Sequence, residues 1–404
     1  MNVYTMAWRS VWRNRRRSVV NIAAMTLSLC VLILYSGMVE GYVRGLEEDL
    51  VQVELGDLQI FAGDYLDNPS IHTRIEPSEP LVAELERAGF AASPRLVAGG
   101  LLARGNASAG VRLVGLEVQR DRSVSAVYQR IARGEWLDPQ DLRGVVLGRG
   151  LARVLEARVG DELVVVSQAA DGSIANDLLR VRGILGIVGA GTDRTAVFMN
   201  AMAFRELMVV PRGAHQVVVR RPPGSDLQAA ARTVRRIARD YEVRTWQELM
   251  PTVAMMVEQS RSMTYLVFGL VYVAVGFLLL NAMLMAVFER IREFGVLKAV
   301  GMGPGRVLAM IMTEAAIQVG VALVVGLTAS LPAMWYLATR GVDVGVLGGA
   351  SVLGVAMRQV WNGVFTPASI SGPVVTLLVV VFLAVLYPAL RAAWIRPVAA
   401  MSHQ

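Results

Sequence analysis

One uncharged run constrains this chain more than any other feature. Residues 262–288 carry no ionisable side chain except two tyrosines, which stay neutral at physiological pH. A helix rises roughly 1.5 Å per residue, so this run can cross a hydrocarbon core about 30 Å thick, where a helix satisfies its own backbone amides. The run therefore predicts a transmembrane helix over 262–288.

The residues that follow, 289–306, are strongly charged. The segment ends in Gly-Met-Gly-Pro-Gly, in which Pro304 suits the first position of a following helix. Its charged side chains are Glu289, Arg290, Arg292, Glu293, Lys298 and Arg306. A short amphipathic hairpin is thus expected to join two membrane helices.

Three further apolar runs reach membrane length, at residues 18–39, 307–339 and 373–390. The first is longer than the core of a signal peptide and has no small-residue cleavage site after it, so we expect a retained helix and not a signal peptide. Pro332 is expected to kink or end the second of these runs, and Pro388 to end the third.

Composition excludes a purely soluble protein, because 54% of the residues are hydrophobic and only 18% are charged. The net charge of +7 rests on arginine, with Lys298 as the single lysine. On a membrane protein such charge is typical of cytoplasmic loops beside anionic lipids, so nucleic-acid binding is disfavoured. Cys30 is the single cysteine, which excludes an intramolecular disulfide and favours a small buried apolar role.

Arginines predict the orientation of the chain. Residues 1–17 combine two tryptophans with five arginines and no acid, a pattern typical of a helix lying on the cytoplasmic membrane surface. Basic residues also concentrate in 289–306 and 391–404, so both termini and the hairpin are expected inside, and the loop 340–372 outside. The fold class is then an α-helical membrane protein with four transmembrane helices and a large mixed α/β domain in the periplasm.

The periplasmic domain is expected over 40–261. Apolar residues recur at helical spacing through 40–54 and 248–261, which predicts stalk helices that continue the spans into water. Two ordinary surface helices are the alternative. Strand-like and helical runs alternate between them and suggest two subdomains, with a strand-rich part at about 95–210 inserted into the other. The expected strands are 57–61, 111–115, 144–147, 162–166, 178–188 and 216–219, and the expected helices are 80–88 and 227–241, the second capped by Ser225 or Asp226.

The sequence shows no pattern typical of an enzyme or of a metal or cofactor site. A phosphate-binding loop ends in Gly-Lys-Ser/Thr, but the single lysine precedes Ala299. The glycines at 301, 303 and 305 follow no strand, so a tight turn is favoured over a dinucleotide site. The histidines lack metal-ligand spacing and are interpreted as structural; they are His72, His215 and His403.

Glu314 stands out because a carboxylate inside a membrane helix is costly unless it faces protein or water. A proton path is one interpretation. Contact with the neighbouring helix or with the charged hairpin is favoured.

Residues 289–315, ERIREFGVLKAVGMGPGRVLAMIMTEA, resemble the cytoplasmic loop and following helix of permeases in the MacB superfamily of ABC transporters. That superfamily includes macrolide-efflux permeases, lipoprotein-releasing permeases of the LolC and LolE type, and the cell-division permease FtsX. Further segments are similar to the family's periplasmic core and tail, namely 145–166, 181–188, 243–251 and 387–401. The resemblance implies the family's architecture, the type VII ABC permease fold.

The resemblance also implies a mechanism. Such permeases work as dimers, with a second copy or a paralogue, on separate or fused ATPase subunits that bind ATP and Mg²⁺, and the hairpin docks on the ATPase as a coupling helix. Here a hydrophobic ridge would come from Ile291, Phe294, Leu297 and Val300, and ion pairs with the ATPase from Arg290, Arg292, Glu293 and Lys298. The alternative is that these charges only fix the topology against lipid headgroups.

Length and the single early span make the chain most similar to the lipoprotein-releasing members, and the chain is not fused to an ATPase. Extraction of lipoproteins for a periplasmic carrier is therefore the expected function, with small-molecule or peptide efflux and mechanotransmission as alternatives. A receptor or scaffold with a partner other than an ATPase is the other class considered. Acyl chains would need an apolar cleft near the outer leaflet, for which the candidates are Val39, Tyr42, Met256 and Met263. Packing between the stalks would explain the same four residues.

Overall fold

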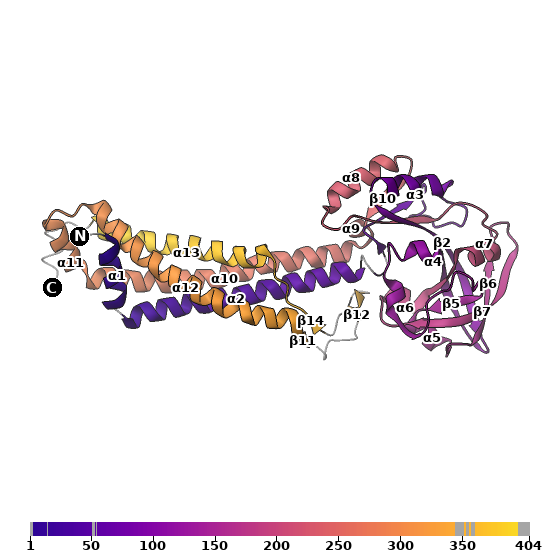
Figure 1. The fold of residues 1–404 in the computed structure, drawn as a ribbon, viewed down its shortest axis with the longest axis horizontal. Coiled ribbons are helices and arrows are strands. Elements are labelled where there is room, and N and C mark those ends of the chain that lie inside the picture. The colour runs from indigo at the N-terminus through magenta and orange to yellow at the C-terminus, as the bar shows by residue number, and fades with distance from the viewer. Residues whose placement is uncertain are drawn as a thin grey trace. The chain divides into compact units, whose positions relative to one another are not determined.

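The computed structural model describes residues 3–13, 15–50, 53, 55–343, 351–352, 355–356 and 360–394. These residues form two compact units (Figure 1). The helical unit contains residues 1–43, 257–343 and 360–404, and the mixed unit contains residues 44–256 and 344–359. The final stretch of the expected tail, 395–404, lies outside the described residues.

Four long helices dominate the helical unit. They are α2 (Arg15–Leu50), α10 (Pro251–Glu289), α12 (Pro304–Arg340) and α13 (Pro367–Trp394). Within the described part of the chain, these four are long and apolar enough to cross a membrane. Two shorter helices accompany them, α1 (Val3–Arg13) and α11 (Ile291–Ala299), and the two-residue strands β11 (Val342–Asp343) and β14 (Val360–Trp361) pair with each other. The pair of β12 (Ser351–Val352) with β13 (Val355–Ala356) belongs to the mixed unit.

Two prolines lie inside long helices of this unit. Pro332 lies inside α12, which continues to Arg340, so this proline does not end the helix. Pro388 likewise lies inside α13, which begins at Pro367 and continues to Trp394, so the prediction of a span over 373–390 that ends at Pro388 is wrong. A proline inside a helix leaves a backbone carbonyl without its usual N–H donor, and the hydrocarbon core offers no water to replace it. Neighbouring helices can supply the missing partner, so membrane helices tolerate proline.

The core of the helical unit forms where small residues let the helices approach. Leu29 of α2 is fully buried against Gly326 of α12, where an added Cβ would lie 2.8 Å from the leucine Cδ2. Cys30 is partly buried beside it, and its thiol contacts the Gly326 carbonyl at 3.2 Å. The Tyr272 hydroxyl of α10 donates to the Pro373 carbonyl of α13 at 2.6 Å. Close backbone approach therefore joins α2 to α12, and a side-chain hydrogen bond joins α10 to α13.

The mixed unit is built on one sheet, which has ten strands among the described residues. Its order is β10-β1-β9-β2-β3-β8-β5-β7-β4, with β6 pairing with β2 and β7. The strands are β1 (Leu58–Phe61), β2 (Ala91–Arg104), β3 (Ala107–Leu116), β4 (Ile131–Gly134), β5 (Gly144–Leu147), β6 (Glu162–Gln168), β7 (Ile174–Leu185), β8 (Ala196–Asn200), β9 (Gln216–Arg220) and β10 (Glu242–Thr245). The pairs β3–β8 and β5–β7 are parallel, and the other pairs are antiparallel.

Helices cover this sheet (Figure 1). They are α3 (Ser78–Arg87), α4 (Val118–Asp121), the 3-10 helix η2 (Val127–Arg130), α5 (Arg149–Val154), α6 (Ala190–Thr195), α7 (Ala201–Met208), α8 (Leu227–Ile237) and α9 (Trp246–Leu249). Asp226 caps α8 by accepting from the Ala229 amide at 2.8 Å, as the sequence suggested. Such a cap satisfies an amide that the first turn leaves unpaired.

The long strand β2 connects two hydrophobic cores. One core is formed by both ends of the mixed unit and includes Leu58, Leu85 and Val234. Another core lies between Leu96 and Val210 in the sequence. Strand β2 contributes Ala92 to the first core and Leu96 and Leu102 to the second, so its side chains bridge them.

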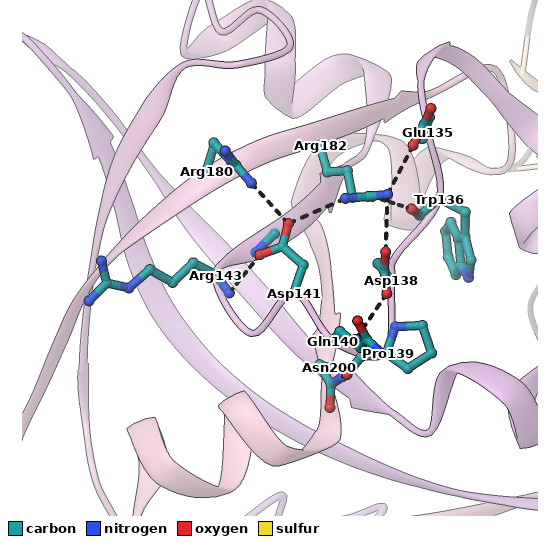
Figure 2. A network of polar contacts seen from close by, with 11 residues as sticks. Glu135, Trp136, Asp138, Pro139, Gln140, Asp141, Arg143, Arg180, Arg182 and Asn200 are labelled. Carbon is teal, nitrogen blue, oxygen red and sulfur yellow. Dashed lines mark hydrogen bonds and ion pairs between the residues drawn. The ribbon is translucent and has the colours of Figure 1, made fainter.

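A network of ion pairs holds the segment between β4 and β5 against β7 (Figure 2). Asp141 accepts from the Gly144 amide at 3.0 Å and from the guanidinium groups of Arg180 and Arg182 at 3.1 and 3.4 Å. Burial alone would raise the pKa of Asp141, but these hydrogen bonds outweigh it and lower the pKa. Arg182 also pairs with Glu135 at 2.9 Å. Ion pairs within the domain therefore fix the segment between β4 and β5, and the charged groups of this network are engaged with one another.

Candidate functional site

The short helix α11 is separated from its neighbours by two backbone breaks. Arg290 leaves helical geometry, with φ −106° and ψ 9°, and so ends α10 and starts α11. Gly301 has φ +98°, its amide donates to the Lys298 carbonyl, and the Met302 amide donates to the Leu297 carbonyl at 3.0 Å. This pattern is a Schellman motif, which needs a residue that tolerates positive φ. The glycines after α11 therefore form a tight turn, as the sequence predicts.

Arg290 is buried and connects three elements. Its guanidinium lies 3.1 Å from Glu314 of α12 and 3.0 Å from Glu293 of α11, and its Cζ lies 5.1 Å from the centre of the Phe294 ring. Glu314 thus contacts the charged hairpin, which is the favoured sequence interpretation. Arg290 is therefore engaged by other side chains of the protein itself.

Helix α1 joins the same network. Arg13 donates to Glu293 at 2.7 Å, and Arg17 at the start of α2 pairs with Glu289 at 3.0 Å. Burial would raise the pKa of Glu293, but its hydrogen bonds to Arg13 and Arg290 outweigh this effect and lower the pKa. The first pair therefore ties α1 to α11, and the second ties the start of α2 to the end of α10.

The C-terminal end of α11 is held by α13. The Lys298 ammonium donates to the Ala393 carbonyl near the end of α13. A cation near the C-terminus of a helix interacts favourably with its unpaired carbonyls. Partial burial lowers the pKa of Lys298. This lysine therefore supports α11 from inside the helical unit.

The predicted hydrophobic ridge faces inward for the most part. Ile291 and Phe294 are only 9% and 2% exposed, and Leu297 is half-buried in the same core. Val300, in contrast, is 83% exposed. Ile291 and Phe294 thus pack into the helical unit, and the docking role of the four residues stays a prediction. The charges Arg290 and Lys298 face inward too.

The outer surface of α11 consists of other residues. Arg292 and Glu293 are exposed, and Val296 is 50% exposed. Sequence reasoning missed Val296, although Arg292, Val296 and Val300 follow each other at the i, i+4 spacing of one helix face. These three residues form the exposed stripe of α11.

A groove of about 570 Å³ lies beside this stripe, between α1, α11 and α12. Four arginines and one glutamate line it around an apolar floor: Arg9, Arg13, Arg290, Arg292 and Glu293, with Met6, Val296, Leu297 and Met310. A partner that presents an acidic and an apolar side chain would complement such a groove. The part played by α1 was not predicted from the sequence.

The four candidate substrate residues are placed as follows. Tyr42 packs on Trp361 with ring centres 4.8 Å apart, so packing within the helical unit accounts for it. Val39 is half-buried on α2, and Met263 is 48% exposed on α10. Met256 is half-buried and belongs to the mixed unit.

The described histidines have different surroundings. His215 is fully buried; its Nδ1 accepts from the Val97 amide and its Nε2 contacts the Ile71 carbonyl, both at 3.1 Å. His72 is exposed, and His403 lies outside the described residues. His215 is therefore a structural histidine.

These features define a multi-pass membrane protein with a large α/β unit between its first two long helices and a braced, charged helix after the second. Residues 18–237 match the family model of the MacB-like periplasmic core domain, and residues 265–397 match that of the FtsX-like permease C-terminal region. The chain belongs to this MacB and FtsX family of ABC transporter permeases. It is a multi-pass inner-membrane permease with its α/β domain in the periplasm, which confirms the family and the location predicted from the sequence.

Two curated relatives are similar to this chain. The lipoprotein-releasing system transmembrane protein LolC of Neisseria meningitidis is 23% identical over 96% of this chain and 94% of the relative. An uncharacterized ABC transporter permease of Methanocaldococcus jannaschii is 26% identical over 46% of each chain. The family consists of permease components, which implies ATPase partner subunits and no catalytic activity of the permease itself.

Solved structures were also compared with this chain. The periplasmic region of MacB from Actinobacillus actinomycetemcomitans matches 49% of this chain and 92% of that chain, with 14% identity and a TM-score of 0.36. The extracellular domain of the transporter YknZ from Gram-positive bacteria matches 46% of this chain and 98% of that chain, with 13% identity and a TM-score of 0.32.

Proposed function

We propose that this permease couples ATP hydrolysis by a partner subunit to the extraction of lipoproteins from the inner membrane for delivery to the outer membrane. The observation that carries the proposal is the similarity to LolC, which extends over 96% of this chain and 94% of the relative. In this proposal ATP and its Mg²⁺ bind to the ATPase, and the permease itself binds no cofactor. A second permease copy or paralogue completes the complex, and a periplasmic carrier receives the lipoprotein.

The ATPase is proposed to dock on the exposed stripe of α11 and the groove beside it. Arg292 and Val300 would provide a charge and an apolar contact for the ATPase. The ion pairs of Arg290 and Glu293 support this mechanism, since a push on α11 reaches α1 and α12 without bending α11. Helix α10 is unbroken from Pro251 to Glu289, which suits it to carry the movement toward the periplasmic domain.

On the periplasmic side, we propose that the two cores joined by β2 belong to two subdomains, with about 95–210 as the inserted one. The substrate contacts are proposed at Val39, Met256 and Met263, with Tyr42 contributing once its contact with Trp361 opens. Flexible methionine side chains suit acyl chains of irregular shape.

Co-purification tests the docking proposal. The ATPase should be recovered with the wild-type permease and lost with Arg292→Glu and Val300→Asp, because both residues are exposed and the changes leave the core intact. Arg340→Glu, at the other end of α12, is the matched control and should retain the ATPase. Equal recovery with all four proteins would contradict docking on α11.

The substrate is tested by ATP turnover of the recovered complex. A triacylated lipoprotein should stimulate turnover, whereas a non-acylated form of the same protein and a macrolide should not. Stimulation by the macrolide alone would favour efflux. A response to neither, with the ATPase still bound, would favour mechanotransmission.

A further inference from the structure

A basic hollow of about 650 Å³ lies on the periplasmic domain. Three separate elements supply its arginines: Arg133 comes from β4, Arg149 and Arg153 from α5, and Arg158 from the turn before β6. All four side chains are exposed. The hollow thus gathers positive charge from parts of the chain that only the fold brings together.

The ion-pair partners of these arginines can be compared with those of other arginines in the domain. None of Arg133, Arg149, Arg153 and Arg158 has an ion-pair partner within the described residues. Nearby arginines of the same domain do have one: Arg180 and Arg182 pair with Asp141, and Arg104 pairs with Asp161 at 2.9 Å. Glu156 is the single acid among the residues lining the hollow. The hollow therefore combines four guanidinium groups with one carboxylate and has a net positive charge.

The floor of the hollow is apolar and rigid. It is made of Ala152, Ala157, Ile184 and Leu185, which are 5%, 7%, 7% and 0% exposed. Pairing between β4 and β7 sets Arg133 opposite Ile184, which places a charge directly beside this floor. The hollow therefore combines positive charge with a small exposed apolar area, which suits an occupant that brings negative charge and an apolar side chain.

We propose that this hollow binds an acidic segment of a partner polypeptide, with its carboxylates on the arginines and an apolar side chain on the floor. Guanidinium groups pair with carboxylates through two parallel hydrogen bonds, which gives this interaction its directional preference. Four arginines on three elements fit several carboxylates spread along a peptide better than one compact phosphate. The proposal needs the domain to be periplasmic and does not depend on which substrate the transporter moves.

Fluorescence anisotropy tests the proposal with the full-length permease in phosphatidylcholine nanodiscs. The probe is a fluorescein-labelled octapeptide of alternating Glu and Leu, with the Lys-Leu octapeptide as its charge-reversed counterpart. The test variant is Arg149→Gln with Arg153→Gln. The matched control is Arg232→Gln with Arg236→Gln, which removes two exposed arginines at the same i, i+4 spacing from α8.

The Glu-Leu peptide should bind the wild type and the control variant alike, and at least about tenfold more weakly to the test variant, because charge-assisted hydrogen bonds are lost. Binding should weaken as salt is added. The proposal is overturned if the peptide does not bind the wild type, if the test variant binds it as well as the wild type does, or if the control variant loses binding equally. Inorganic phosphate or phosphatidylglycerol vesicles binding in an Arg149- and Arg153-dependent way, in place of the peptide, would overturn it in favour of a phosphate site. An unchanged thermal unfolding profile of the test variant attributes the loss to the site.

Discussion

The Arg290 guanidinium lies 3.1 Å from the Glu314 carboxylate, and each side chain is only 10% exposed. Arg290 also pairs with Glu293, which in turn pairs with Arg13. Alternating charges therefore run from α12 through α11 to α1. This arrangement explains how an acid is accommodated three turns into a membrane helix, and it makes α11 part of a braced assembly.

Removing one member of the buried pair should be costly. Glu314→Ala leaves Arg290 without its buried carboxylate, and we expect a loss of about 3 kcal/mol in the free energy of unfolding. The double variant Arg290→Met with Glu314→Leu should be closer to the wild type, since it leaves no unpaired charge in the core. The stability of both variants is measured by thermal unfolding in detergent, with labelling of the partly buried Cys30 thiol as the readout of unfolding.

The exposed pair provides the control for that prediction. Arg13 and Glu293 are 57% and 45% exposed, so Arg13→Ala should cost less than about 1 kcal/mol. A larger loss for Arg13→Ala than for Glu314→Ala would show that the exposed contact, and not the buried one, holds α11.

The pH dependence of the periplasmic domain should follow His215. Burial lowers the pKa of His215 to about 4, with Arg74 and Arg205 adding to the effect. Because the unfolded chain binds this proton near pH 6.5, stability is full above that pH and is lost as the pH falls from 6.5 toward 4. We expect a loss of about 2 kcal/mol between pH 7.5 and pH 5. Pulse proteolysis in urea measures it, and His215→Asn should flatten the dependence whereas exposed His72→Asn should not.

The Arg182 network gives a third prediction, which separates a buried contact from a surface one. Arg182→Met removes the ion pairs to Glu135 and Asp141 and the hydrogen bond to the Trp136 carbonyl at 2.8 Å, so we expect a loss of about 2 kcal/mol. Arg180→Met removes one pair from a side chain that is 58% exposed and should cost less than about 1 kcal/mol. Similar urea midpoints for the two variants in pulse proteolysis would refute this ranking.

Sequence patterns predicted the elements that have a clear local signal, such as a long uncharged run or a short apolar run between turns. The membrane helices follow from length and lack of charge, and strand β5 begins and ends at the bounds predicted from its short apolar run, Gly144 and Leu147. Strand β2 was missed because Pro94 and the pair Gly99 and Gly100 are typical of turns. In the structure β2 changes its pairing partner from β9 to β6 along its length. Gly100 lies where an added Cβ would be 3.3 Å from the Val166 carbonyl. A change of pairing partner and a close approach between strands depend on residues distant in the sequence, so the sequence around β2 does not indicate them.

The candidate site shows the same limit. The charged hairpin after the second span could be recognised from the sequence, but the direction in which each side chain points could not. Phe294 faces the core because α11 packs on α12, and Arg290 faces Glu314 across 24 positions of sequence. A helix of nine residues can have apolar side chains on two sides, and its sequence alone does not show which side is buried. Packing against the rest of the fold decides this.

A last prediction concerns the approach of α2 to the segment before α13. An added Cβ at Gly41 would lie 1.9 Å from the Asn362 carbonyl oxygen, and the Val364 amide donates to the nearby Gly37 carbonyl at 3.0 Å. Gly41→Ala should therefore displace this segment and cost about 1 to 3 kcal/mol, the usual cost of overpacking.

Gly269 of α10 is the matched control, because an added Cβ there meets nothing within 4 Å. Gly269→Ala should be neutral or slightly stabilising, since alanine favours the helix by up to about 1 kcal/mol. In the Cys30 labelling assay we expect Gly41→Ala to lower the stability of the protein and Gly269→Ala to leave it unchanged or raise it slightly. If Gly41→Ala is as stable as Gly269→Ala, close contact between α2 and Asn362 does not hold the helical unit together, and the Tyr42–Trp361 contact beside it is then free to open for a substrate.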